Sequence, residues 1–147
     1  MLIPLNMRHD GTPQRRTRAI DVTAAIMLDG DAVLLSRRPQ GDPLAGYWEL
    51  PGGKLEPGEM PQACLARELA EELGIEARVG ELFTVSTHSY PHVTVRLLAY
   101  RIASWRGEFE LRAHDEHRWV EPAEAMELPL APADVPILEK LARTAAS

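Results

Sequence analysis

Residues 52–75 read GGKLEPGEMPQACLARELAEELGI, a glycine-rich loop that runs into a helical pattern. Pro61 suits the first turn of a helix, and Gly74 is typical of the left-handed residue that follows the last turn. Met60 is a poor N-cap, because helices usually place Ser, Thr, Asp or Asn there. The stretch therefore predicts a helix over residues 61–73 that is weakly capped at its start and sharply ended.

The predicted helix has one apolar and one charged face. At about 100° per residue, the charged arc holds Arg67, Glu68, Glu71 and Glu72. A solvated surface is the ordinary explanation of such an arc. However, three carboxylates on one patch repel one another unless a positive charge lies among them. Mg²⁺, a hard cation that prefers oxygen ligands, fits this patch and would make it a reaction site.

The loop and the helix together resemble the Nudix box of the Nudix hydrolase family at every specified position. The matching run is Gly53, five residues, Glu59, seven residues, Arg67-Glu68-Leu69, one residue, Glu71-Glu72, one residue, Gly74-Ile75. So many fixed positions, in a loop-helix context that agrees, make the match specific. The resemblance implies an α/β fold: an α/β/α sandwich with a mixed β-sheet and a loop-helix catalytic motif.

In this family the box glutamates hold Mg²⁺ or Mn²⁺. By resemblance, the metal ligands here are Glu68, Glu71 and Glu72, with a backbone carbonyl of Gly52 or Gly53. Arg67 and Glu59 resemble the supporting pair, in which a guanidinium bridges the loop and helix carboxylates. The alternative for Arg67 is an ordinary surface ion pair with Glu71.

A further carboxylate often comes from a late loop of the family domain. Glu116, in the run His114-Asp115-Glu116-His117, is the candidate for this role, and Asp115 is the alternative. Glu116 could instead be a solvated loop acid. With metal at these carboxylates, a bound water would be activated for in-line attack on phosphorus.

Across residues 20–141 the chain resembles the MutT-like branch, whose members hydrolyse 8-oxo-dGTP to the monophosphate and pyrophosphate. Arg38 resembles the strand-end arginine that contacts the nucleotide; an edge-protecting charge is the alternative. Asp134 falls where MutT-like proteins have an asparagine that reads the purine edge. An ionised aspartate only accepts hydrogen bonds, so the identity of the base stays open. Asp134 is also a candidate N-cap of the last helix.

Two other functions stand beside 8-oxo-dGTP hydrolysis. Residues 128–136, LPLAPADVP, also resemble a bacterial relative that acts on CTP and modified pyrimidine triphosphates. The other alternative is a non-catalytic module that senses a nucleotide. It is disfavoured because such modules lose box glutamates, and none is lost here. His88 and His92 are interpreted as strand-surface residues and not as metal ligands.

Strands are predicted both before and after the helix in the sequence, and another helix is predicted at the end. This order is typical of an α/β domain with a mixed sheet between helices. The predicted elements are an antiparallel hairpin of residues 20–28 and 32–35, a second hairpin of 79–88 and 93–102, a short strand at 118–120, a helical turn at 122–127 and a terminal helix at 133–145. Residues 1–18 show no apolar period and predict a flexible leader, so the Nudix-like domain spans residues 19–147.

Composition limits the class of protein. A net charge of −6 argues against a general nucleic-acid surface. The expected partner, a nucleoside triphosphate, is what the resemblance to the Nudix family implies. The single cysteine, Cys64, excludes an internal disulfide and suits a reducing cytoplasm. No stretch approaches the roughly twenty apolar residues that span a bilayer, so no membrane association is expected. No pattern indicates an oligomeric state.

Overall fold

The computed structural model describes residues 18–146. Of the predicted leader, residues 1–18, only Arg18 falls within this range, and it is the first residue of a strand. The rest of the leader lies outside the described residues. Within the described range, no helix is long and apolar enough to cross a membrane.

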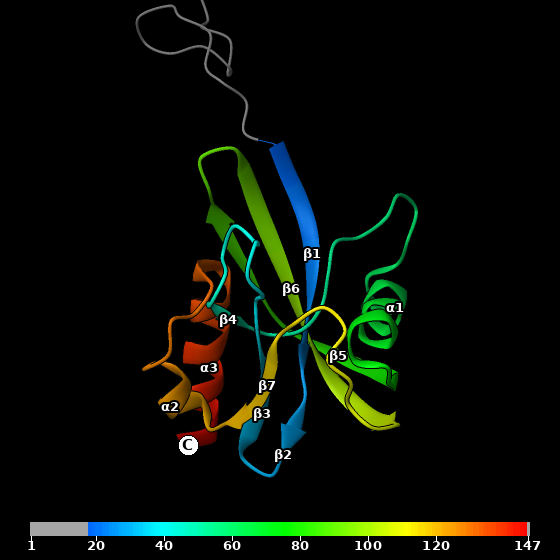
Figure 1. The fold of residues 1–147 in the computed structure, drawn as a ribbon, viewed down its shortest axis with the longest axis vertical. Helices are drawn as coiled ribbons and strands as arrows, with labels where there is room; N and C mark the ends of the chain where they lie inside the picture. Colours follow the sequence, from blue (N-terminus) through cyan, green and yellow to red (C-terminus); the bar gives the residue numbers. More distant parts are fainter. Residues whose placement is uncertain (1–17, 147) are drawn as a thin grey trace, which may run out of the picture.

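The molecule has three layers (Figure 1). Helix α1 (Pro61–Leu73) lies on one side of the strands, and α2 (Pro122–Ala125) and α3 (Val135–Ala146) lie on the other. A 3-10 turn, η1 (Pro132–Asp134), takes the place of the predicted first residues of the last helix. The predicted α/β/α sandwich is confirmed.

The first sheet is mixed and has the strand order β1-β6-β5. Strands β5 (Glu76–Ser89) and β6 (Val93–Arg106) form the second predicted hairpin and extend beyond its predicted bounds. Strand β1 (Arg18–Ile26) pairs with β6 in parallel, from Arg18 opposite Val93 to Ile26 opposite Arg101.

The first predicted hairpin is therefore only partly correct. Around Gly30, just two residue pairs join β2 (Leu28–Asp29) to β3 (Ala32–Arg37). The preceding strand, β1, does not pair with β3 but with β6 in the first sheet. The physical reason is burial: residues 24–27 are all inaccessible to solvent. A strand that is enclosed on both faces suits parallel pairing in a sheet covered by helices on both sides.

The second sheet is built around β3. This strand pairs antiparallel with β2, with the short β4 (Trp48–Glu49) and with β7 (Glu116–Val120). The predicted strand at residues 118–120 is confirmed but begins at Glu116, directly opposite Arg37. This candidate ligand thus lies on a strand and not in a loop.

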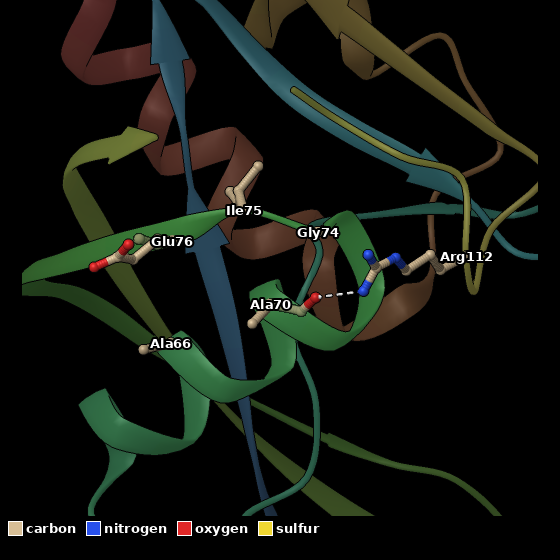
Figure 2. A pocket seen from close by; sticks show the side chains of 7 residues that line it. Ala66, Ala70, Gly74, Ile75, Glu76 and Arg112 are labelled. Atoms are coloured by element: carbon tan, nitrogen blue, oxygen red, sulfur yellow. Dashed lines mark hydrogen bonds between the residues drawn. The ribbon is translucent and has the colours of Figure 1, made fainter. Parts of the chain in front are cut away.

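Helix α1 is fixed by its apolar face and by its C-terminal end. Its buried leucines pack into a core that also contains Met27 and Leu34. Gly74 has φ +70° and donates its N–H to the carbonyl of Ala70, as predicted for a left-handed C-cap. Arg112 Nη1 also donates to this carbonyl, at 3.1 Å, beside a cavity of about 330 Å³ (Figure 2). A cation at this end also suits the helix dipole.

The cavity beside Arg112 is not the reaction site. Ala66 and Ala70 line it together with Gly74 and Ile75. Glu68 and Glu72 each come two positions after one of these alanines, which places them about 200° away around the helix. The carboxylates therefore face the other way.

Candidate active site

The loop before α1 is attached to β1 by backbone hydrogen bonds. Ala25 N–H donates to the Pro51 carbonyl at 2.8 Å, and Thr23 N–H donates to the Gly53 carbonyl at 2.8 Å. Leu55 N–H donates to the Asp21 carbonyl at 3.1 Å. The loop thus runs antiparallel to β1 along the edge that β6 does not occupy, and it has a fixed position before α1 begins.

Two glycines bring this loop against the carboxylates of α1. A methyl group on Gly53 would lie 2.2 Å from Glu68 Cδ, and one on Gly52 would lie 2.0 Å from the Thr23 carbonyl oxygen. Gly52 N–H donates to Glu72 Oε2 at 3.3 Å. Glycine is therefore required at both positions so that the backbone can approach so closely.

Alanine at these two positions should give different defects. Gly53→Ala should displace the Glu68 carboxylate, which is the end of a flexible side chain, and lower kcat/KM by about tenfold or more with little change in melting temperature. Gly52→Ala should lower the melting temperature as well, because its methyl meets the backbone of β1. Thermal melts and steady-state kinetics check both. Wild-type activity in Gly53→Ala would show that the position of Glu68 does not matter for turnover.

Arg67 joins the loop to the helix. Its Nε and Nη2 donate to the two carboxylate oxygens of Glu59 at 2.8 and 3.0 Å. Its Nη1 lies 3.0 Å from Glu68 Oε1 and 3.2 Å from Glu71 Oε2. The guanidinium lowers the pKa of Glu59 to about 2. This fork is the bridge that the sequence predicts, and it is more than a single pair with Glu71.

The box carboxylates differ in their surroundings. Burial raises the pKa of Glu72 to about 7, an effect that His114 opposes and Glu68 increases. Burial also raises the pKa of Glu68, against the effect of Arg67. Glu71 is more exposed and turns toward Arg67. In the described part of the chain, no three acidic, histidine or cysteine side chains converge closely enough to enclose a metal ion. Of the box carboxylates, Glu68 and Glu72 lie beside the glycine loop and offer the oxygen ligands that a hard cation prefers.

The two predicted glycine carbonyls are not equivalent. The Gly53 carbonyl accepts hydrogen bonds from Thr23 N–H at 2.8 Å and from Thr23 Oγ1 at 3.0 Å. An oxygen that already accepts two hydrogen bonds is a poorer metal ligand, which favours the carbonyl of Gly52.

The structure does not bring the predicted late-loop carboxylates to the box. Asp115 Oδ1 lies 2.7 Å from Arg37 Nε, and Glu116 contacts Arg37 at 3.5 Å and Arg118 at 2.9 Å. The charged groups that affect Glu72 are His114, Glu68 and Glu49. The 114–117 segment thus places its histidine, and not Asp115 or Glu116, near Glu72.

Sequence reasoning missed Glu49 and His114. His114 Nε2 lies 2.8 Å from Glu49 Oε2, and Arg38 Nη1 donates to Glu49 Oε1 at 3.1 Å. Burial disfavours the charged form of His114, but Glu49 and Glu72 outweigh it and raise the pKa. The sequence does offer a local signal for Glu49, because an acidic residue stands there between the apolar Trp48 and Leu50, just before the glycine loop. Nothing local indicates His114, which lies far away in the sequence.

A cavity of about 550 Å³ adjoins these groups and brings together Arg38 and Asp134, the two predicted nucleotide-binding residues. Its polar wall also includes Glu49, and its other walls are mostly apolar side chains of β1, β6 and two loops. Mixed lining of this kind is typical of small-molecule sites. His92, predicted as a strand-surface residue, also lines the cavity.

Asp134 is the most deeply buried acid of the site, with 5% of its surface exposed. Its Oδ2 accepts a hydrogen bond from Leu50 N–H at 2.8 Å. This donor lies far away in the sequence and does not belong to the last helix, for which Asp134 was a candidate N-cap. Burial raises its pKa well above the usual range, and nearby Glu49 adds to the effect. The raised pKa favours the neutral carboxyl, which both donates and accepts, over the ionised form, which only accepts.

Comparison with known proteins gives a consistent set of relatives. A family model described as the NUDIX domain matches residues 17–141. The CTP pyrophosphohydrolase of Escherichia coli is 41% identical over 122 residues, which cover 83% of this chain and 90% of that protein. The putative 8-oxo-dGTP diphosphatase 2 of Mycobacterium tuberculosis is 41% identical over 130 residues, which cover 84% and 88%.

Solved structures agree. The solution structure of the E. coli ORF135 protein has a TM-score of 0.76 at 41% identity and covers 84% of this chain and 88% of that one. The crystal structure of a MutT protein from Methanosarcina mazei has a TM-score of 0.81 at 24% identity, covers 91% of this chain and 100% of that one, and supports the fold alone. With the box complete and the family model matching most of its length, this chain belongs to the NUDIX family and is a hydrolase of that family.

Proposed function

We propose that this protein hydrolyses 8-oxo-dGTP to the monophosphate and pyrophosphate with Mg²⁺ or Mn²⁺ as cofactor. The observation that carries the proposal is the 550 Å³ cavity, which holds Arg38 and Asp134 and reaches Glu49 beside the loop-helix carboxylates. A base in this cavity would leave its phosphates directed toward Glu68 and Glu72. The 41% identity to a putative 8-oxo-dGTP diphosphatase supports the same substrate.

The residues of the loop-helix box have two roles in this proposal, metal binding and orientation of the metal-binding carboxylates. Glu68, Glu71 and Glu72 would hold the metal with the Gly52 carbonyl, and Arg67 and Glu59 orient these carboxylates. A metal bound there would neutralise charge on the phosphate oxygens and lower the pKa of a bound water. Glu116, or Asp115 as its alternative, would join this set only after leaving Arg37. Arg38 would contact the nucleotide from the cavity wall.

CTP is the second candidate substrate. The Escherichia coli relative named CTP pyrophosphohydrolase is as similar in sequence as the 8-oxo-dGTP relative. A neutral Asp134 suits either base, since its hydroxyl donates to a carbonyl oxygen and its oxygens accept from an N–H group. The non-catalytic alternative is set aside because every box glutamate is present and these relatives are named as enzymes. We also propose a cytoplasmic location, where a free buried thiol such as Cys64 stays reduced.

Asp134→Asn should separate the substrates. Asparagine must accept from Leu50 with its carbonyl oxygen, so it presents only donors to the base, whereas the neutral carboxyl also accepts. We expect the ratios of kcat/KM among 8-oxo-dGTP, dGTP and CTP to change by about tenfold or more. Dependence on Mg²⁺ should stay as in the wild type. Steady-state hydrolysis of the three triphosphates, with products identified, provides the measurement.

The pH dependence gives this substitution an internal control. Because the pKa of Asp134 is raised, rising pH removes its O–H donor, and KM for the preferred base should increase on the alkaline side. The amide of an asparagine does not titrate, so this increase should be absent in the variant. Ratios unchanged within about twofold, with the same pH profile, would remove Asp134 from base recognition.

A further inference from the structure

Thr23 is a polar side chain buried beneath the catalytic loop, and it lies outside the box that identifies the family. It belongs to β1 and has 1% of its surface exposed. From its contacts we propose that Thr23 is a positioning residue, whose hydroxyl fixes the loop backbone at Gly53 against the carboxylates of α1. The inference rests on the proposed metal-dependent hydrolysis.

The Thr23 hydroxyl engages both polar groups of one glycine. Its Oγ1 donates to the Gly53 carbonyl at 3.0 Å and lies within reach of Gly53 N–H at 3.4 Å. The backbone N–H of Thr23 donates to the same carbonyl at 2.8 Å. Gly53 is therefore held through its N–H and its C=O, which belong to the two peptide groups on either side of its Cα, so the course of the backbone through this residue is fixed.

Cys64 adds a contact from the helix. Its Sγ lies 3.6 Å from Thr23 Oγ1, and its S–H is in reach of the carbonyls of Gly53 at 3.6 Å and Lys54 at 3.5 Å. Arg67 Nη2 donates to the Lys54 carbonyl at 3.4 Å. The buried hydroxyl thus lies where β1, the loop and α1 meet.

A buried hydroxyl is costly unless it is hydrogen-bonded, and strand interiors usually hold apolar β-branched residues. Val would fill the same space without a hydroxyl, so the hydroxyl of Thr23 is explained by its hydrogen bonds to the backbone of Gly53. The loop backbone at Gly52 and Gly53 lies directly against the site: a methyl on Gly53 would lie 2.2 Å from Glu68 Cδ, and Gly52 N–H lies 3.3 Å from Glu72 Oε2. Releasing Gly53 would therefore shift the loop relative to both carboxylates.

Thr23→Val tests the role, because it keeps the shape and removes the hydroxyl. The first readout is Mn²⁺ binding to the protein without substrate, followed by the electron paramagnetic resonance signal of free Mn²⁺. We expect Thr23→Val to weaken Mn²⁺ binding by about tenfold and to lower kcat by a similar factor, with KM changed by less than about twofold. Thr23→Ser, which keeps the hydroxyl, should restore both within about twofold.

Thr94→Val is the matched control, since it removes a strand hydroxyl that pairs with Ser89 and lies away from the loop. Its Mn²⁺ affinity and kcat should equal the wild type. Wild-type affinity and kcat in Thr23→Val would overturn the positioning role. A wild-type protein that binds no Mn²⁺ would instead overturn the proposed function. If Thr23→Val does not fold, Thr23→Ala and Thr23→Ser make the same comparison, and equal Mn²⁺ affinity in these two would overturn the inference.

Discussion

Glu72→Gln is expected to abolish metal-supported hydrolysis and leave the fold intact. The amide keeps the shape of the side chain and can still accept from Gly52 N–H, but it loses the charge that binds Mg²⁺. We expect kcat to fall by more than about 100-fold at saturating Mg²⁺, with a far-UV circular dichroism spectrum like that of the wild type. Retention of more than about a tenth of the activity would mean that Glu72 is not a metal ligand.

The same variant should be more stable than the wild type in alkaline solution without metal. Burial raises the pKa of Glu72 to about 7 from an ordinary 4.5. The unfolded chain ionises this group first, so the folded state loses stability as pH rises from 4.5 to about 7, and the loss is complete above that. Gln avoids this loss and should add up to about 3 kcal/mol at pH 8 and nothing near pH 4.

Urea unfolding at pH 4 and pH 8 measures this difference. Glu139→Gln, on the exposed surface of α3, is the control and should show no comparable gain at either pH. A Glu72→Gln protein less stable than the wild type at pH 8 would mean that the carboxylate stabilises the fold, which contradicts a site that favours added positive charge.

Helix α1 and its carboxylates could be predicted from the sequence because their determinants are local. Pro61, Gly74 and the period of the leucines lie within the segment that they specify. The fork of Arg67 also follows from local spacing, since Glu59 is in the adjoining loop and Glu71 is one turn away.

Features that depend on distant parts of the chain could not be predicted in this way. The hairpin signal at Gly30 is real, but it cannot reveal that β1 pairs in parallel with β6. Likewise, the burial that raises the pKa of Asp134 depends on elements far apart in the sequence, so no local pattern around Asp134 indicates it. Glu116 has a strand partner in Arg37, which no loop motif around Glu116 would indicate.

Arg67→Lys should be nearly as damaging as Glu72→Gln, although it conserves the charge. The guanidinium donates to both oxygens of Glu59 and at the same time to Glu68. An ammonium group is a single point of charge and cannot hold these carboxylates in one plane. We expect kcat/KM to fall by about 100-fold, with weaker Mn²⁺ binding and an unchanged far-UV spectrum. Steady-state kinetics and Mn²⁺ titration of the substrate-free protein measure both effects.

Arg96→Lys is the matched control for the loss of a fork. Arg96 donates through Nε and Nη2 to both oxygens of Asp21, at 2.8 and 2.7 Å, in an exposed pair outside the box. Its replacement should leave kcat and Mn²⁺ affinity unchanged. If Arg67→Lys behaves in the same way, Arg67 is only a surface partner of Glu71, because a lysine at the same spacing serves such a pair equally well. If only Arg67→Lys loses metal affinity, the geometry of the fork, and not its charge, arranges the carboxylates for the metal.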